Sequence, residues 1–210
     1  MKKYLQYGSG LSDPKSFDNY DASLTLVFEH LPFIGKLYTK NDSRFPKDTK
    51  YGNIVKGLPV KPSSMSGVYC SHVLEHLTVD EFRKALRNTH FYLVPGGLFR
   101  LVMPDLEFYC QKYLDSNDPR RSFKLQQMLW LRREVPRSGL RGFIVDWFGH
   151  DKHCWLWDYQ SAAAELRNAG FKNIRRAQFG DSEDPVFCEA EERGRWDDYL
   201  GIECRKPNSL

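Results

Sequence analysis

Two histidines and a glutamate stand close together in segment 72–76, which reads His-Val-Leu-Glu-His. The pattern matches the H-x-x-E-H spacing of some metalloproteases. That chemistry needs both histidines on one face of a long helix and a further ligand downstream. Here the helix is expected to begin only at Thr78, after the second histidine, so we disfavour metal hydrolysis. Glu75 and His76 are expected to satisfy backbone groups at the turn, and His72, at the tip of a strand, is the candidate proton acceptor.

The segments on both sides of this motif predict a strand, a helix and a second strand. Residues 67–70 form a short apolar strand, and the spacing of Thr78 and Glu81 is that of a capping box, which marks a helix start. Residues 94–97, Val-Pro-Gly-Gly, are expected to end the helix. Residues 98–103 are typical of a strand that is covered on both faces. The predicted helix has one buried stripe of residues at helical spacing, namely Phe82, Ala85, Leu86, Thr89 and Leu93.

The rest of the chain continues this alternation of strands and helices. Helical structure is expected within 24–46 and 105–150, and from Asp158 through Ala169. The alternation favours an α/β fold with a doubly wound, mostly parallel sheet and helices on both faces. We interpret residues 1–210 as a single domain. The remaining strands are expected at residues 4–7, 16–21, 51–55, 173–179 and 200–205.

The composition excludes several classes of protein. A hydrophobic content of 41% predicts a folded chain, and a net charge of +4 is too weak to indicate nucleic-acid binding. The five cysteines are scattered without a C-x-x-C pair, which disfavours a disulfide framework and a zinc–thiolate site. No stretch approaches the roughly 20 apolar residues of a membrane span, and no apolar run follows the charged start as in a signal peptide. We therefore expect a cytoplasmic protein. It is also expected to be either a monomer or a homodimer.

Three short segments are expected at the carboxyl ends of the first strands, where ligands collect in such sheets. Gly8-Ser9-Gly10 follows the first strand and would let a ligand lie against the main chain, although a plain tight turn is the alternative. Asp21 ends the second strand, and its carboxylate could take both hydroxyls of a ribose. Asn53, near the third strand, could bond a base edge or a ribose. The gap from Gly10 to Asp21 is too short for a helix and a strand, which disfavours a dinucleotide dehydrogenase.

With these residues in place, the chain resembles class I S-adenosylmethionine-dependent methyltransferases, and within them a small bacterial branch. The block from VLEHL to LVPGGLFRLVMPD is the most specific part of the resemblance. The resemblance implies a Rossmann-like sheet of seven strands in the order 3-2-1-4-5-7-6, with the last strand antiparallel. The matching segments span nearly the whole chain and are YLQYGSG, NYDAS, YGNIVKGLPV, VYCSHVLEHL, LVPGGLFRLVMPD, HCWLWDYQSAAAELRNAGF and YLGIECRKP.

The resemblance also implies S-adenosyl-L-methionine as the cofactor. The loop at residues 8–10 would lie against its methionine part, and Asp21 would hold its ribose. Asn53 and Ile54 would flank the adenine, while the end of the fourth strand would close the site near the sulfonium. The full set of implied cofactor contacts is Tyr7, Gly8, Ser9, Gly10, Asp21, Ala22, Asn53, Ile54, Ser71 and His72.

Methyl transfer asks little of the protein, because the sulfonium already carries an activated methyl group. The chain must align the acceptor with the S–CH3 bond and exclude water. A base is needed only if the acceptor keeps its proton, and the two predicted catalytic residues are His72, as that base, and His153, as an acceptor contact. Some related quinone O-methyltransferases carry an acid-x-x-Glu-His metal site at this position. Because His72 replaces the acid here, we predict no metal ligand.

The acceptor is expected to be a small molecule, such as a sugar or a cell-surface precursor, under a lid formed by a helical insertion at 105–150. Trp155 and Trp157 are expected to fill the core around the inserted helices. The arginines of this insertion are expected on a solvated helix face or opposite an acidic acceptor. Two departures from the family keep open a non-catalytic module that binds a cofactor or ligand. Asn53 stands where an aspartate is usual, and the Tyr7 ring could crowd the cofactor pocket.

Overall fold

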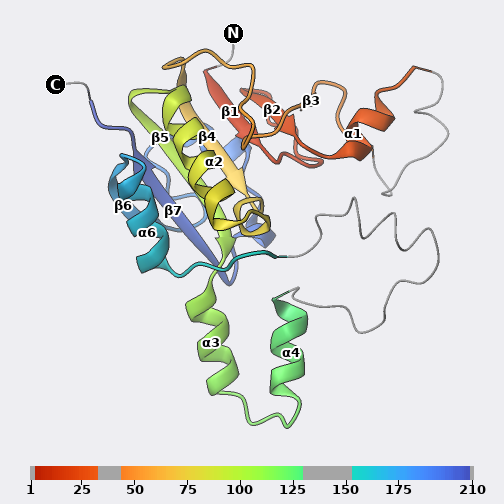
Figure 1. The fold of residues 1–210 in the computed structure, drawn as a ribbon, viewed down its shortest axis with the longest axis vertical. Helices are drawn as coiled ribbons and strands as arrows, with labels where there is room; N and C mark the ends of the chain where they lie inside the picture. The colour runs from red at the N-terminus through yellow and green to blue at the C-terminus, as the bar shows by residue number, and fades with distance from the viewer. Residues whose placement is uncertain (1–2, 33–43, 130–152, 209–210) are drawn as a thin grey trace.

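The computed structural model describes residues 3–32, 44–129 and 153–208 of the chain (Figure 1). Their strands form one seven-stranded sheet in the order β3-β2-β1-β4-β5-β7-β6. The neighbours from β3 to β5 run parallel, and β7 runs antiparallel to both β5 and β6. The predicted sheet, its strand order and its antiparallel last strand are confirmed. The strands are β1 (Tyr4–Tyr7), β2 (Phe17–Asp21), β3 (Lys50–Tyr51), β4 (Met65–Ser71), β5 (Leu93–Pro104), β6 (Lys172–Ala177) and β7 (Tyr199–Arg205).

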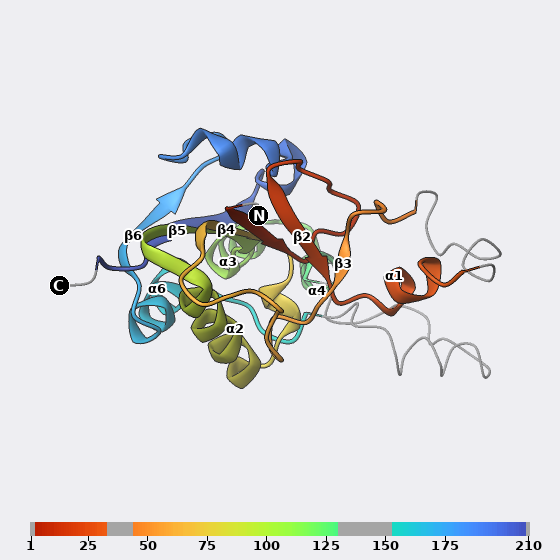
Figure 2. The same cartoon turned by 90° about the horizontal axis from the view of Figure 1, so that it is seen from above.

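Two α-helices cover one face of the sheet, α2 (Val79–Tyr92) and α6 (Tyr159–Asn168) (Figure 2). The predicted capping box begins α2: the Thr78 hydroxyl accepts the N–H of Glu81, and the Glu81 carboxylate accepts the N–H of Thr78. The apolar side of both helices packs on the strands and forms the main core. Buried members of this core include Leu5, Val68, Phe82, Ala85, Leu86, Phe99, Ala162 and Leu166.

The connection between β6 and β7, residues 178–198, covers the opposite face (Figure 2). It contains two short 3-10 helices, η3 (Pro185–Glu189) and η4 (Arg193–Arg195). Phe187 and Trp196 of this connection are buried in a second apolar cluster that includes Phe17, Tyr69, Leu98 and Val102 of the sheet. Because the link between β1 and β2 forms no helix, this face depends on a connection from the other end of the chain.

Three further helices follow the carboxyl ends of β2 and β5, namely α1 (Leu24–Glu29), α3 (Leu106–Leu114) and α4 (Arg121–Met128). The pair α3 and α4 extends away from the sheet (Figure 1), and no residue of α4 is buried. Residues 130–152 lie outside the described part of the chain, so the lid over an acceptor stays a prediction. None of the described helices is both long and apolar enough to cross a membrane.

Several predicted element boundaries are wrong. The strand expected at 173–179 is β6 and ends at Ala177. Two other differences have a clear physical cause. The strand expected at 51–55 stops after two residues, because the Asn53 side chain accepts two main-chain N–H groups of its own turn, at 2.8 and 3.2 Å. The helix expected to include Leu93 ends at Tyr92. Leu93 is extended and already pairs with Met65 of β4, so β5 absorbs the Val-Pro-Gly-Gly segment that was expected to separate helix from strand.

Candidate functional site

The loops after β1 and β2 are tied together at the carboxyl edge of the sheet. Gly10 donates its N–H to Asp21 Oδ2 at 2.9 Å, and Ser23 donates its N–H to Asp21 Oδ1 at 2.8 Å. The N–H of Ser9 bonds to the carbonyl oxygen of Tyr20 at 3.1 Å. The Asp21 carboxylate is therefore fixed beside the glycine loop, and its two oxygens retain further lone pairs for a ligand.

The two glycines of this loop have different surroundings. Both have positive φ, 68° at Gly8 and 54° at Gly10. A Cβ atom on Gly8 would lie 1.9 Å from Val73 Cγ2, so this glycine packs against the loop that follows β4. A Cβ atom on Gly10 would meet no heavy atom within 4 Å among the described residues. A ligand can therefore approach the main chain at Gly10 rather than at Gly8.

The Tyr7 side chain lies in the core. It is 1% exposed, its ring centroid is 6.5 Å from that of Phe99, and its hydroxyl lies 3.3 Å from Thr89 Oγ1. Burial raises its pKa well above the ordinary value for tyrosine. The expectation that this ring crowds a cofactor pocket is wrong, because the ring packs among core residues. Tyr7 can offer a ligand only its main chain.

The residues predicted around the adenine and ribose are partly engaged inside the protein. The Asn53 side-chain oxygen accepts two N–H groups of its own turn, which leaves its NH2 group as the donor for a ligand. Ile54 is buried in the core, and its carbonyl oxygen accepts a hydrogen bond from Asn88 Nδ2 at 2.6 Å. Ala22, beside Asp21, is exposed. This turn can therefore meet a ligand through Asn53 more readily than through Ile54.

His72, which follows the buried Ser71 at the end of β4, is held on both ring nitrogens. Its Nδ1 lies 3.2 Å from Glu75 Oε1, and its Nε2 lies 3.1 Å from the carbonyl oxygen of Arg195. Because a carbonyl oxygen only accepts, Nε2 carries a proton, while Nδ1 is occupied by the carboxyl group. The ring also meets the edge of the Tyr199 ring, with 4.4 Å between centroids. Both ring nitrogens are therefore engaged inside the protein. The role of His72 as a base stays a prediction, and it requires one of these two contacts to open.

His153 reaches the same edge of the sheet from a distant part of the chain. The next two main-chain N–H groups donate to the carbonyl oxygen of Glu75 at 2.7 and 3.1 Å, which fixes this segment to the 3-10 helix η2 (Leu74–His76). The His153 ring lies beside the His76 ring, with 5.1 Å between centroids. Burial lowers the pKa of His153 below the usual value, which favours the neutral imidazole at neutral pH.

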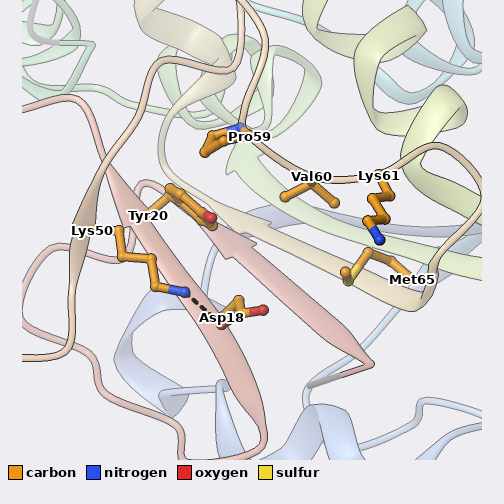
Figure 3. Close-up of a pocket in the computed structure, with 7 residues that line it drawn as sticks. All are labelled: Asp18, Tyr20, Lys50, Pro59, Val60, Lys61 and Met65. Atoms are coloured by element: carbon orange, nitrogen blue, oxygen red, sulfur yellow. Dashed lines mark hydrogen bonds and ion pairs between the residues drawn. The ribbon is translucent and has the colours of Figure 1, made fainter. Parts of the chain in front are cut away.

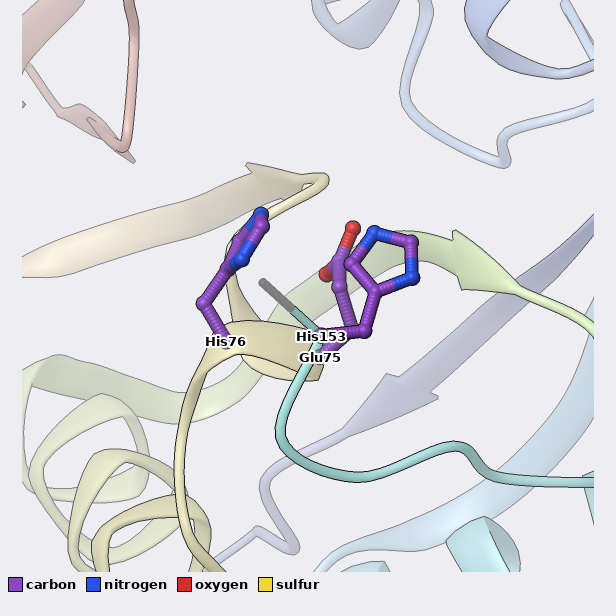
Figure 4. A group of neighbouring side chains, drawn as sticks. All are labelled: Glu75, His76 and His153. Atoms are coloured by element: carbon purple, nitrogen blue, oxygen red, sulfur yellow. The ribbon is translucent and has the colours of Figure 1, made fainter. Parts of the chain in front are cut away.

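Glu75, His76 and His153 form a compact group of the metal-ligand type (Figure 4). One ligand atom from each residue lies within 4.8 Å of those of the other two. Figure 4 shows the Glu75 carboxylate beside the His153 ring, with the His76 ring across from them. Sequence reasoning missed this group because its third member comes from a segment far along the chain. The H-x-x-E-H spacing was a signal, but it pointed to His72 instead of His153.

The two tryptophans after His153 differ in burial. Trp157 is buried and stacks on Phe82 of α2 with 4.4 Å between ring centroids, as expected for a core residue. Trp155 was also expected in the core, but its side chain is 49% exposed. The centroid of its ring is 6.1 Å from that of Trp157, and Trp157 is the one that stacks on Phe82 of α2. The segment therefore presents one exposed indole next to His153.

A cavity of about 410 Å³ lies on the sheet beside β2 and β3 (Figure 3). Lys50 donates to Asp18 Oδ1 at 2.9 Å within it. None of the predicted site residues lines this cavity, so it is separate from the site at the carboxyl edge. Its lining consists of Asp18, Tyr20, Lys50, Pro59, Val60, Lys61 and Met65.

No family model matches the sequence, and no curated protein matches it. Solved structures do match the fold. A methyltransferase bound to the Trm112 methyltransferase activator of Haloferax volcanii is 17% identical; the match covers 98% of this chain and 82% of that chain, with a TM-score of 0.50. A SAM-dependent methyltransferase of Thermotoga maritima is 15% identical, with 97% and 82% covered and a TM-score of 0.51. This chain has the methyltransferase fold.

A SAM-dependent methyltransferase of Methanosarcina mazei agrees with this, at 16% identity, with 98% of this chain and 92% of that chain covered and a TM-score of 0.51. The methyltransferase fold therefore spans almost the whole chain. Sequence identities this low show the fold alone. What a methyltransferase fold does in this chain must be argued from its own side chains.

Proposed function

We propose that this chain transfers a methyl group from S-adenosyl-L-methionine to a small-molecule acceptor. The observation that carries the proposal is the open main-chain surface at Gly10 beside the fixed carboxylate of Asp21. Both lie at the carboxyl edge of a mostly parallel sheet, where ligands collect. The residues fit the cofactor here, because Asp21 keeps lone pairs beyond those that bind two N–H groups.

Each part of this edge would have its own task. Asp21 would accept the ribose hydroxyls, and the main chain at Gly10 would lie against the methionine part. Asn53 would donate its NH2 group to the adenine or the ribose. The bound cofactor supplies an activated methyl group on its sulfonium. The chain itself has to align the acceptor and keep water out, and the buried Ser71 and the ring of His72 would close that end of the site.

The acceptor side of the site is proposed to lie around His153 and Trp155. The exposed indole of Trp155 offers a flat apolar surface with a polar edge. Such a surface suits the apolar face of a sugar ring, so we keep a sugar or a cell-surface precursor as the proposed acceptor. The exposed guanidinium groups of Arg120 and Arg121, at the start of α4, suit an acidic or phosphorylated group on it.

Calorimetric titration with S-adenosylmethionine and with its demethylated product tests the proposal. We expect one site per chain. Asp21→Asn should weaken binding about ten-fold or more, because it removes a charged acceptor. Asp18→Asn is the matched control, since Asp18 lies on the same strand but in the separate cavity. If saturating amounts of both compounds give no heat and leave the melting temperature unchanged, the proposal is refuted.

A non-catalytic module with the methyltransferase fold is the second candidate, and one observation favours it. The side-chain oxygens of Asp21 and Asn53 already accept main-chain N–H groups, so both loops are stabilised without a ligand. The two candidates differ in turnover. An enzyme incubated with labelled cofactor and a pool of small metabolites releases the demethylated cofactor and a labelled product, both visible by mass spectrometry. A binding module releases neither.

A further inference from the structure

One oxygen of the buried Glu75 carboxylate lacks a hydrogen-bond partner among the described residues. The side chain is 1% exposed, and Oε1 meets His72 Nδ1 at 3.2 Å. Oε2 is buried and has no hydrogen-bond partner among residues 3–32, 44–129 and 153–208. Burying a carboxylate oxygen without a partner is costly, and buried charges are normally paired or bound to a metal. Something outside the described protein atoms is therefore expected to complete this carboxylate.

A second unpartnered atom lies beside it. His153 Nδ1 is buried and has no hydrogen-bond partner within the described part of the chain. The main chain holds His153 in this position, because the N–H groups of the next two residues donate to the carbonyl oxygen of Glu75. The His76 ring lies on the other side of the same group (Figure 4). Two imidazoles and one carboxylate thus converge within 4.8 Å.

We propose that Glu75, His76 and His153 bind one divalent transition-metal ion. Two imidazole nitrogens and one carboxylate oxygen form the donor set of open zinc sites and of sites for other first-row metals. Magnesium and calcium prefer oxygen donors alone, so they fit this set less well. Three protein ligands leave a coordination position for water or for an oxygen of another molecule.

Only a small adjustment of the side chains is needed to close this site. Two ligands at about 2.1 Å from one zinc ion lie at most about 4.2 Å apart. The three ligand atoms here lie within 4.8 Å of one another without an ion. Glu75 and His76 share the helix η2, and main-chain bonds hold the His153 segment against the same helix. Rotation of side chains can therefore bring the donors together while the backbone stays in place.

His72 takes a positioning role in this arrangement. Its Nδ1 holds one oxygen of Glu75, while its Nε2 is anchored on the carbonyl oxygen of Arg195. The other carboxylate oxygen would then be free to bind the metal. Outer partners commonly orient metal ligands in this way. His72 is therefore not counted as a ligand, although it belongs to the H-x-x-E-H pattern.

Zinc titration of the chelator-treated protein tests the site, with calorimetry and metal analysis as readouts. We expect one zinc ion per chain, and a visible absorption band when cobalt(II) replaces it. His153→Ala and His76→Ala should each weaken zinc binding more than about 100-fold, beyond the 10- to 100-fold typical of an outer partner such as His72. His30→Ala is the matched control, because His30 is exposed at the end of α1. It should bind zinc as the unchanged protein does.

Folding of each variant is checked by its circular dichroism spectrum. His153 is only partly buried, so His153→Ala keeps the test valid even if a change at the buried Glu75 prevents folding. The proposal is overturned if the chelator-treated protein binds no zinc, or if His153→Ala binds it as tightly as His30→Ala does. These measurements need no turnover and no adenosyl compound. Failure of the metal site is therefore distinguishable from failure of the proposed methyl transfer.

Discussion

The imidazole of His72 and the carboxylate of Glu75 are joined by a contact of 3.2 Å between Nδ1 and Oε1, and this contact limits what His72 can do. The other ring nitrogen reaches the carbonyl oxygen of Arg195 at 3.1 Å. His72 has a positive φ of 56°, and its bond to Arg195 joins the end of β4 to the β6–β7 connection. The ring therefore links the sheet to the layer that covers its second face.

Replacing His72 by asparagine should cost stability. Asparagine tolerates a positive φ, but it cannot span both partners of the imidazole. We expect the free energy of unfolding to fall by about 1–3 kcal/mol, since two hydrogen bonds are lost, one of them to a buried carboxylate. Urea unfolding at neutral pH measures this loss. His30→Asn, at an exposed position, should change it by less than about 0.5 kcal/mol. Unchanged stability with a 10²- to 10⁴-fold slower methyl transfer would instead make His72 a base.

The two glycines of the β1 loop should respond differently to alanine. Gly8→Ala should destabilise the protein by about 2–5 kcal/mol, because the new methyl group would meet Val73 and the positive φ adds strain. Gly10→Ala should cost only about 1–2 kcal/mol from φ, yet weaken binding of S-adenosylmethionine by filling the open surface. Urea unfolding and calorimetric titration measure the two effects. Gly194→Ala, which has open space and no strained φ, should change neither.

Arg100 forms the deepest ion pair among the described residues, and its loss should be severe. The guanidinium is fully buried, bonds to the Glu191 and Glu203 carboxylates, and stacks on Trp196 at 4.3 Å. Arg100→Met would leave the buried Glu191 carboxylate without its cation, while Glu203 keeps its pair with Arg175 at 2.7 Å. We therefore expect a loss of about 3–5 kcal/mol. Arg83→Met breaks a surface pair with Glu165 and should cost about 1 kcal/mol or less. Similar losses in thermal or urea unfolding would contradict this ranking.

Those parts of the fold that depend on neighbouring residues could be predicted from the sequence. The capping box at Thr78, the helix that follows it and the apolar run of β5 are local signals, and each is present in the structure. The strand order came from the resemblance, because no local pattern specifies which strands pair. The cover of the second face could not be predicted, since Phe187 and Trp196 become core residues only by packing on Phe17 and Tyr69.

The candidate site shows the same division. The positions of Gly10 and Asp21 at the carboxyl edge followed from strand ends alone. The state of His72 did not, because its second partner is the main chain of Arg195, far along the sequence. Nor could the pairing of Glu75 with His153 be read from spacing, since main-chain bonds to a later segment create it. Long-range contacts, rather than weak local patterns, account for what was missed.

The cap of α6 should make part of the stability depend on pH. Asp158 Oδ1 accepts hydrogen bonds from the N–H and the hydroxyl of Ser161, both at 2.7 Å, and these bonds lower the pKa of this carboxyl below its usual 3.8. A carboxyl whose pKa is lower in the folded state stabilises the protein above the unfolded pKa and loses that contribution as pH falls through the folded pKa. The cap contribution should thus be complete above about pH 5 and decline below about pH 4.

Asp158→Asn separates this effect from the other carboxyl groups, because an asparagine oxygen caps a helix without titrating. The difference in unfolding free energy between the unchanged protein and this variant should stay constant from about pH 7 to about pH 5. Below that, the unchanged protein should lose stability relative to the variant as Asp158 takes up a proton. Urea unfolding across this range measures it. Ser161→Ala removes only the hydroxyl bond and keeps the bond from the main-chain N–H. The unfolding free energy of this variant should therefore still fall in acid, but by less than that of the unchanged protein. A difference that moves toward the unchanged protein in acid would mean that folding raises this pKa.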